Sequence, residues 1–205
     1  MLELFVSSFI TLFVIIDPPG CAPIFAGLTA GTTATHRRAM AIRAVLVAAG
    51  ILLTFALAGE PLLHALGIEL ASFRIAGGVM LFLIALEMVF EKRTQRREDR
   101  AAKITTEEAD DVSIFPMAMP MIAGPGSIAS VMLLTARSNG IEQTAVVMAA
   151  LGANLLLMLM ALLAAGPLMR VLGAKIEAVI TRLLGVLLAA LAVQFVIDGL
   201  VEQFR

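Results

Sequence analysis

The chain has 205 residues, of which 60% are hydrophobic and 15% charged, with a net charge of −1 and a mean hydropathy of +0.98. Soluble domains are nearer one half apolar and one quarter charged, so this composition indicates a membrane protein and argues against a nucleic-acid partner. A single cysteine, Cys21, excludes an intrachain disulfide and a cysteine-based metal cluster. The first ten residues contain Glu3 and no Lys or Arg, so we expect a retained helix there and not a secretory signal.

Long apolar runs follow one another along the chain, and several exceed the roughly 18 residues needed to cross a bilayer. The runs cover residues 4–30, 39–59, 71–90, 113–136, 144–165 and 178–201. Backbone groups in lipid must be satisfied within their own segment, and no stretch alternates polar and apolar residues for long, so helices are expected. The predicted fold class is an all-α, polytopic membrane protein with about six transmembrane helices.

The first run is interrupted by Asp17-Pro18-Pro19-Gly20. Proline lacks a backbone donor and clashes with the preceding turn, so the helix over 4–16 should stop there. Asp is a good N-cap and Pro fits the first helical position, so a second half-helix should begin immediately. The break is either a capped kink or part of a substrate site, because backbone groups left unpaired at membrane depth need a partner.

The third and fourth runs are separated by a strongly charged stretch, which we interpret as a solvated loop, with a docking site as the alternative. This loop divides the chain into an N-terminal three-helix unit over 1–90, a charged cytoplasmic loop over 91–112, and a C-terminal three-helix unit over 113–205.

The two units contain matching anchors at offsets of 106, 106 and 108 residues. The anchors are Pro19-Gly20 with Pro125-Gly126, Pro61 and Gly67 with Pro167 and Gly173, and Arg74 and Gly77 with Arg182 and Gly185. Three crossings per unit would insert the units with opposite orientation, which is the inverted-repeat plan of many secondary transporters. The sequence therefore predicts two inverted three-helix repeats with broken first helices.

Loop charges predict the orientation. With six crossings, one side of the membrane has twelve Lys and Arg residues and the other has three, which places both termini outside. If the first and fourth segments are re-entrant hairpins, the count becomes eleven against four, so this topology remains an alternative.

The second unit repeats the break at Gly124-Pro125-Gly126-Ser127, after Pro116 and Pro120. Two breaks related by an inverted repeat can meet near the midplane, where half-helix N-termini favour a carboxylate and exposed carbonyls favour an ammonium group or a cation. The predicted substrate-binding set lies at these two breaks and comprises Asp17, Pro19, Gly20, Gly124, Pro125, Gly126 and Ser127.

Few ionisable or amide side chains fall inside the spans. Asp17 follows a half-helix whose C-terminal dipole disfavours negative charge, so we expect it to be protonated or paired with a cation. Glu87 is a second coupling candidate, with an interfacial acid as its alternative. The remaining intramembrane polar candidates are Arg74 and Arg182, which pair with acids or anchor helix starts, and Asn154 and Gln194, which are expected to form interhelical hydrogen bonds.

Nothing in the sequence indicates a resident cofactor, although H⁺ or Na⁺ coupling fits the plan. His36 and His64 fall in separate connecting regions, so a metal site is not expected. The sequence contains no nucleotide-binding loop, nucleophile–base pair or metalloprotease motif, so we do not expect an enzyme.

Four stretches resemble those of a known family: IIDPPGCAPIF, FRIAGGVMLFLIALEMVF, PMAMPMIAGPGSIAS and TRLLGVLLAALAVQFVIDG. Over nearly the whole chain they resemble the MarC family (UPF0056) of bacterial inner-membrane proteins. The resemblance implies six spans within the broader lysine-exporter-type superfamily. It also implies uptake of small neutral amino acids such as glycine and alanine, which is associated with an archaeal relative.

The site residues carried over by this resemblance are limited to matching positions: Asp17, Pro19, Gly20, Gly124, Pro125 and Gly126. The family often has Asn in an NP-x-G pattern where this chain has Asp17, which adds an ionisable group.

The leading hypothesis is a multi-pass protein of the bacterial inner membrane that transports small neutral amino acids, such as glycine or alanine, or similar metabolites by coupling to an ion gradient. The alternative is a channel or a membrane scaffold without active transport. The sequence does not predict the direction of transport, the coupling ion or the oligomeric state.

Overall fold

A computed structural model describes residues 1–90, 92 and 111–204, and this part of the chain is helical without any β-strand. Its elements are α1 (Leu2–Ile16), α2 (Pro18–Leu28), α3 (Ala34–Ala65), α4 (Leu70–Val89), η2 (Ser113–Ile122), α6 (Pro125–Ala136), α7 (Ile141–Leu163) and α8 (Ala165–Gln203). Five segments are long and apolar enough to span a membrane, or six if the bent pair of η2 and α6 is one span. The predicted all-α membrane fold is confirmed, whereas most of the charged loop over 91–112 lies outside the described residues.

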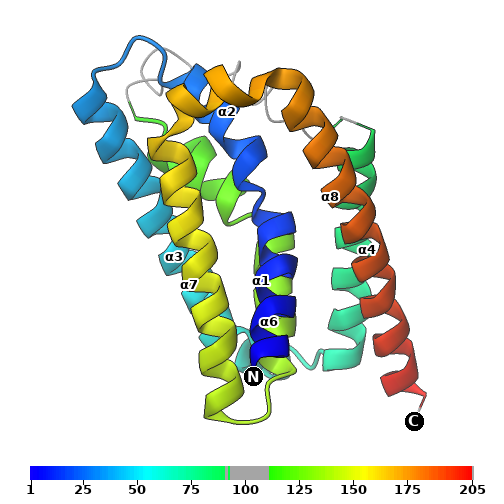
Figure 1. The fold of residues 1–205 in the computed structure, drawn as a ribbon. Helices are drawn as coiled ribbons and strands as arrows, with labels where there is room; N and C mark the ends of the chain where they lie inside the picture. The colour runs from blue at the N-terminus through cyan, green and yellow to red at the C-terminus, as the bar shows by residue number, and fades with distance from the viewer. Residues whose placement is uncertain (91, 93–110, 205) are drawn as a thin grey trace.

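The first apolar run divides into α1 and α2 at Asp17, as its sequence predicts. Asp17 has left-handed backbone angles, with φ 58° and ψ 64°, a conformation that Asp and Asn tolerate better than most residues. Pro18 then occupies the first position of α2, where a missing N–H costs nothing. Both half-helices continue in the same overall direction, so the run crosses the molecule and does not turn back (Figure 1).

The second break differs in form from the first. In η2 the residues Phe115 and Met119 have extended backbone, because each precedes a proline that disfavours the helical conformation. A bend of 53° then separates η2 from α6, with Gly124 as the N-cap of α6. The two breaks are therefore chemically related but not superimposable in local geometry.

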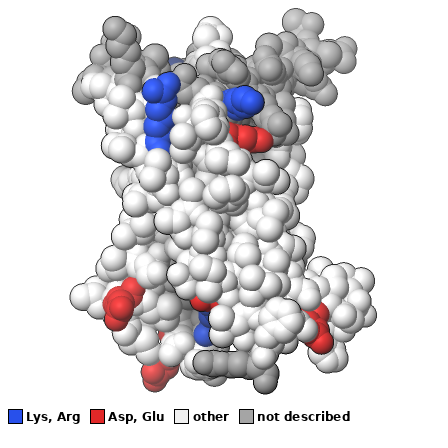
Figure 2. All heavy atoms as spheres, turned by 90° about the vertical axis from the view of Figure 1, so that its right-hand side faces the viewer, with Lys and Arg blue, Asp and Glu red and all other residues white. Residues whose placement is uncertain are grey.

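Both termini lie at one end of the molecule, together with the turns at 66–69 and 137–140 (Figure 1). We call this the terminal end, and the other the basic end, because Arg37, Arg38 and Arg43 lie at the start of α3 there. Between the two ends, Figure 2 shows a broad band on one face without Lys, Arg, Asp or Glu. Such a band fits the hydrocarbon layer of a bilayer.

The helices form two bodies with separate hydrophobic cores. The bundle has one core, built from α1, α2, α3, η2, α6 and α7, with fully buried Leu12, Phe25 and Leu52 among its members. The arm consists of α4 and α8, and Leu81, Met88, Leu188 and other residues form its core. Helix α1 contacts both cores, because Leu12 and Ile16 face the bundle core while Val14 and Ile15 face the arm core.

The arm is held together by small residues that recur every seven positions on two antiparallel helices. These residues are Ala71, Gly78 and Ala85 on α4 and Gly185, Ala192 and Gly199 on α8, all buried. A Cβ added to Gly78 would be 2.8 Å from Ala192 O, and one added to Gly199 would be 2.9 Å from Ala71 O. Backbone-to-backbone packing of this kind is typical of membrane helices, where small residues permit close approach.

Packing partners are exchanged between the two units of the chain. Helices α1 and α2 pack on α7, whereas η2 and α6 pack on α3, and α4 packs on α8. An inverted repeat would produce this exchange of partners, and the repeat itself stays a prediction.

Helix α8 begins at Ala165, well before the apolar run predicted at 178–201. Pro167 lies in its first turn, where proline is tolerated, so the charged residues that follow lie on a continuous helix and do not form a loop. This first part of α8 crosses the basic end and packs on α2 (Figure 1).

Candidate functional site

Asp17 is the central residue of the first break. It is 1% exposed, and its Oδ1 accepts a hydrogen bond of 3.1 Å from the Gly20 N–H, which caps the N-terminus of α2. A Cβ at position 20 would be 2.3 Å from Asp17 Oδ2, so only glycine leaves room for this carboxylate. The first break thus buries an ionisable group at mid-height of the molecule (Figure 1).

The second break lies against both α1 and the arm. A Cβ added to Gly126 would be 3.6 Å from Ile15 Cγ2 and only 2.6 Å from Ile84 Cδ1 of α4. Gly124 is constrained locally, because a Cβ there would be 2.4 Å from the Pro120 carbonyl oxygen. No side chain caps the N-terminus of α6, and Ser127 in its first turn is 2% exposed.

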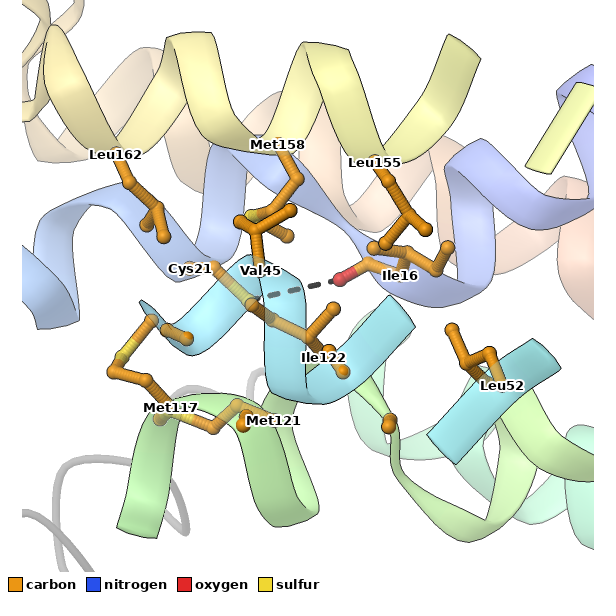
Figure 3. Close-up of a cluster of buried hydrophobic side chains, with 14 of the residues drawn as sticks. Ile16, Cys21, Val45, Leu52, Met117, Met121, Ile122, Leu155, Met158 and Leu162 are labelled. Carbon is orange, nitrogen blue, oxygen red and sulfur yellow. Dashed lines mark hydrogen bonds between the residues drawn. The ribbon is translucent and has the colours of Figure 1, made fainter. Parts of the chain in front are cut away.

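Apolar side chains fill the space between the two breaks. Figure 3 shows Ile16 and Cys21 beside Ile122 of η2, and the Cys21 thiol donates to Ile16 O at 3.6 Å. Leu155 and Met158 of α7 close the cluster from the other side (Figure 3). Residues that flank the two breaks therefore share one buried cluster, in a conformation in which Asp17 is shielded from solvent, and a substrate site between them stays a prediction.

Of the four substrate-site positions predicted at the second break, Gly124, Gly126 and Ser127 are buried and Pro125 is exposed. At the first break, Gly20 is buried beside Asp17, and Pro19 is partly exposed. The glycines of both breaks have structural reasons to be glycine, so their presence alone does not argue for a ligand.

The coupling candidate Glu87 lies near the end of α4, partly buried, and Arg182 lies exposed on the facing helix α8. Glu87 lies one turn beyond Ile84, which touches the second break: a Cβ added to Gly126 would be 2.6 Å from Ile84 Cδ1. The structure thus places Glu87 about one helical turn from the residue that meets the second break, and its coupling role stays a prediction.

Two of the polar candidates are placed differently from each other. Asn154 is fully buried on α7, and its Nδ2 donates to Phe9 O of α1 at 3.1 Å and to Ala150 O at 3.0 Å. Gln194 was expected to be buried and to bond between helices, and that expectation is wrong. It is exposed and donates to Asp198 Oδ1 at 2.7 Å within α8, because Asp198 lies one turn further along the same helix.

Two ion pairs lie at the terminal end: the Arg74 pair was one of the predicted alternatives, whereas the sequence reasoning missed the Arg137 pair. Arg74, at the start of α4, pairs with Glu202 near the end of α8, so it bonds within the arm. Arg137, at the end of α6, pairs with Asp198 and lies 4.8 Å above the Phe195 ring centroid, so it joins the bundle to the arm. In each pair the two residues are far apart in sequence. An acid near the end of a helix does not indicate, from the sequence alone, which basic residue it will contact.

Comparisons with known proteins agree with this architecture. A family model described as "MarC family integral membrane protein" matches residues 2–204. The UPF0056 membrane protein MJ1677 of Methanocaldococcus jannaschii is 36% identical over 202 residues, covering 97% of each chain. The UPF0056 membrane protein YvbG of Bacillus subtilis is 36% identical over 206 residues, covering 100% of this chain and 97% of its own. The UPF0056 inner membrane protein YhgN of Escherichia coli is 32% identical over 198 residues, covering 95% of each chain.

No solved structure matches the chain. Because the family model and these relatives span nearly the whole sequence, the chain belongs to the MarC family of multi-pass integral membrane proteins.

Proposed function

We propose that this protein is a secondary transporter of small neutral amino acids, or of similar small metabolites, coupled to an ion gradient. The observation that carries the proposal is Asp17, a 1% exposed carboxyl group at a break between two half-helices of a membrane span. An ionisable side chain inside the membrane is costly, so one that is retained there is expected to have a functional partner such as a proton or a cation.

The paired breaks supply groups that suit a zwitterion. The first turn of α6 begins at Gly124 without a side-chain cap, so its N–H groups and the helix dipole favour a carboxylate. At the first break, the Asp17 side chain and nearby carbonyls favour the ammonium group or the coupling cation. Pro19, Pro125 and Ser127 then shape the cradle around these groups.

The division of the helices into a bundle and an arm suggests which parts move during transport. The arm is tightly packed within itself through Gly78, Gly185 and Gly199, whereas the second break meets the arm through side chains such as Ile84. We therefore expect α4 and α8 to move together against the bundle, which would uncover the breaks alternately to the two membrane faces.

The same proposal places the protein in the bacterial inner membrane with both termini in the periplasm. Its support is the printed name of the relative YhgN, an inner membrane protein, and the three arginines of the basic end, since basic residues favour the cytoplasmic side. The proposal makes the chain a transporter and not an enzyme.

Uptake of radiolabelled glycine and alanine into proteoliposomes, with and without imposed H⁺ and Na⁺ gradients, tests this proposal. Concentrative, saturable uptake that an ionophore abolishes is the expected result. Flux that needs no gradient would indicate a channel, and no flux of any tested solute would favour a membrane scaffold.

The variant Asp17→Asn isolates the coupling role, because Asn also caps helices and tolerates the left-handed conformation. We expect it to lose gradient-driven uptake, whereas Glu142→Gln, which removes an exposed acid at the start of α7, should retain it. Unchanged uptake and unchanged gradient dependence in Asp17→Asn would show that Asp17 does not couple transport.

A further inference from the structure

The interface between α1 and α6 contains two buried hydroxyl groups without a hydrogen-bond partner in the part of the chain that the structure describes. Ser8 Oγ and Ser130 Oγ each lack one, and both residues are 0% exposed. Other hydroxyls near the end of α6 satisfy themselves locally, since Thr135 donates to Val131 O at 2.9 Å and Ser138 donates to Leu134 O at 3.0 Å. Buried polar groups normally have a partner, so Ser8 and Ser130 require an explanation.

The register of the two helices places these hydroxyls on the same interface. Ile15 of α1 and Gly126 of α6 are in contact distance, and the helices run in opposite directions (Figure 1). Ser8 is seven residues before Ile15, and Ser130 is four residues after Gly126, so each lies on the face that meets the other helix. At about 1.5 Å per residue they lie about 10.5 Å and about 6 Å from that contact, both toward the terminal end. Their levels therefore differ by less than one helical turn.

A third buried atom without a partner among the described residues belongs to Asn154 of α7, whose side chain reaches α1 one residue after Ser8. The Nδ2 of Asn154 donates to the carbonyl of Phe9, the residue after Ser8, and to Ala150 O, which fixes the orientation of the amide. Its Oδ1 is buried and has no partner. Helices α1, α6 and α7 all pack on one another, so the three atoms come from three helices that meet.

The chemistry of this set selects its ligand. Two hydroxyls can donate or accept and the amide oxygen accepts, and none of the three carries a charge. A bare cation at this depth would need a carboxylate or a full shell of oxygens, which Ser8, Ser130 and Asn154 do not provide. Buried water typically makes about three hydrogen bonds to such groups, so the set has the number and mixture that water requires.

We propose that Ser8, Ser130 and Asn154 form a water-binding site buried between α1, α6 and α7, on the terminal side of the two breaks. The site hydrates an otherwise apolar interior and gives this side of the breaks a polar lining. The assignment does not rest on transport, because it follows from the burial and register of the three side chains alone.

Cysteine variants test the site in the full chain in lipid nanodiscs, in a Cys21→Ala background. The variants Ser8→Cys and Ser130→Cys conserve size, and the matched controls are Leu12→Cys, fully buried on α1, and Ile10→Cys, which faces lipid at 49% exposure. Infrared spectroscopy reads the S–H stretch, because a thiol that donates a hydrogen bond to water absorbs at a lower frequency than a thiol among apolar groups. We expect both serine positions to absorb at a lower frequency than either control. Frequencies equal to that of Leu12→Cys would overturn the proposal.

The unmodified chain provides a second measurement that needs no variant. Hydroxyl radicals generated in place by X-ray radiolysis label side chains beside bound water. Leu133 is 0% exposed and lies one turn from Ser130, whereas Leu52 is equally buried on α3 away from the site. Labelling of Leu133 well above that of Leu52 is the expected result, and equal labelling of the two would contradict a bound water.

Discussion

The small-residue seam of the arm allows a quantitative prediction. Changing Gly78, Gly185 and Gly199 together to Ala adds one methyl group at each of three levels between α4 and α8. The new Cβ atoms would be 2.8 Å from Ala192 O, 3.1 Å from Ala85 O and 2.9 Å from Ala71 O. These neighbours are backbone atoms, which cannot rotate away, so the helices must separate by several tenths of an ångström at each level.

The expected magnitude follows from two opposing effects. Overpacking a tight site costs about 1–3 kcal/mol, and replacing Gly by Ala inside a helix returns about 0.5–1 kcal/mol. The levels are seven residues or about 10.5 Å apart, so their effects should be nearly additive. We therefore expect the triple variant to lose about 3 kcal/mol of stability.

The matched control is the double variant Gly50→Ala and Gly152→Ala, since a Cβ at either position meets nothing within 4 Å. It should gain about 0.5–1 kcal/mol per site from helix propensity alone. Stability is measured by reversible unfolding of the purified proteins in mixed detergent micelles. If the triple variant is as stable as the control, the three glycines do not hold the backbones of α4 and α8 in close contact, and the reasoning is refuted.

Three further changes test other contacts. Asp17→Ala should destabilise the protein by about 2–3 kcal/mol because the cap of α2 is lost and Ala tolerates the left-handed backbone less well, whereas Asp17→Asn should cost clearly less; equal losses in thermal unfolding would exclude both causes. A double-mutant cycle on Arg137 and Asp198, whose side chains are 34% and 30% exposed, should give a coupling of about 0.2–1 kcal/mol, and zero coupling would remove this link between bundle and arm. Asn154→Leu should cost about 0.6 kcal/mol through the lost bond to Phe9, and a gain in stability on the same unfolding assay would refute this bond.

The sequence predicts the elements whose signals are local. The break at Asp17 is an example, because a capping residue followed by proline dictates both the end of α1 and the start of α2. The second break was placed correctly at Gly124 to Ser127, but its extended residues Phe115 and Met119 depend on packing against α3 as well as on the following prolines. Local sequence therefore predicts the position of a helix break better than it predicts the backbone geometry at the break.

Contacts between distant segments were not predictable in the same way. Gln194 looked buried because its neighbours are apolar, yet it lies on the exposed side of α8 and bonds to Asp198. The start of α8 at Ala165 was missed because charged residues interrupt the apolar run without interrupting the helix. Ser8 and Ser130 belong to no sequence motif, and only the register of α1 against α6 shows that they lie on the same interface.

The composition of the two cores has a consequence for how the protein is made. The arm core takes α4 from the first half of the chain and α8 from a segment that is synthesised only after η2, α6 and α7. Until α8 is synthesised, the glycine face of α4 has no partner, and the groups around Gly78 and Ala85 must be shielded by lipid or by the insertion machinery. Biogenesis thus passes through an intermediate in which the other bundle helices have been made and α4 still lacks its partner α8, and membrane quality control would recognise a chain shortened before Gly185 by this exposed face.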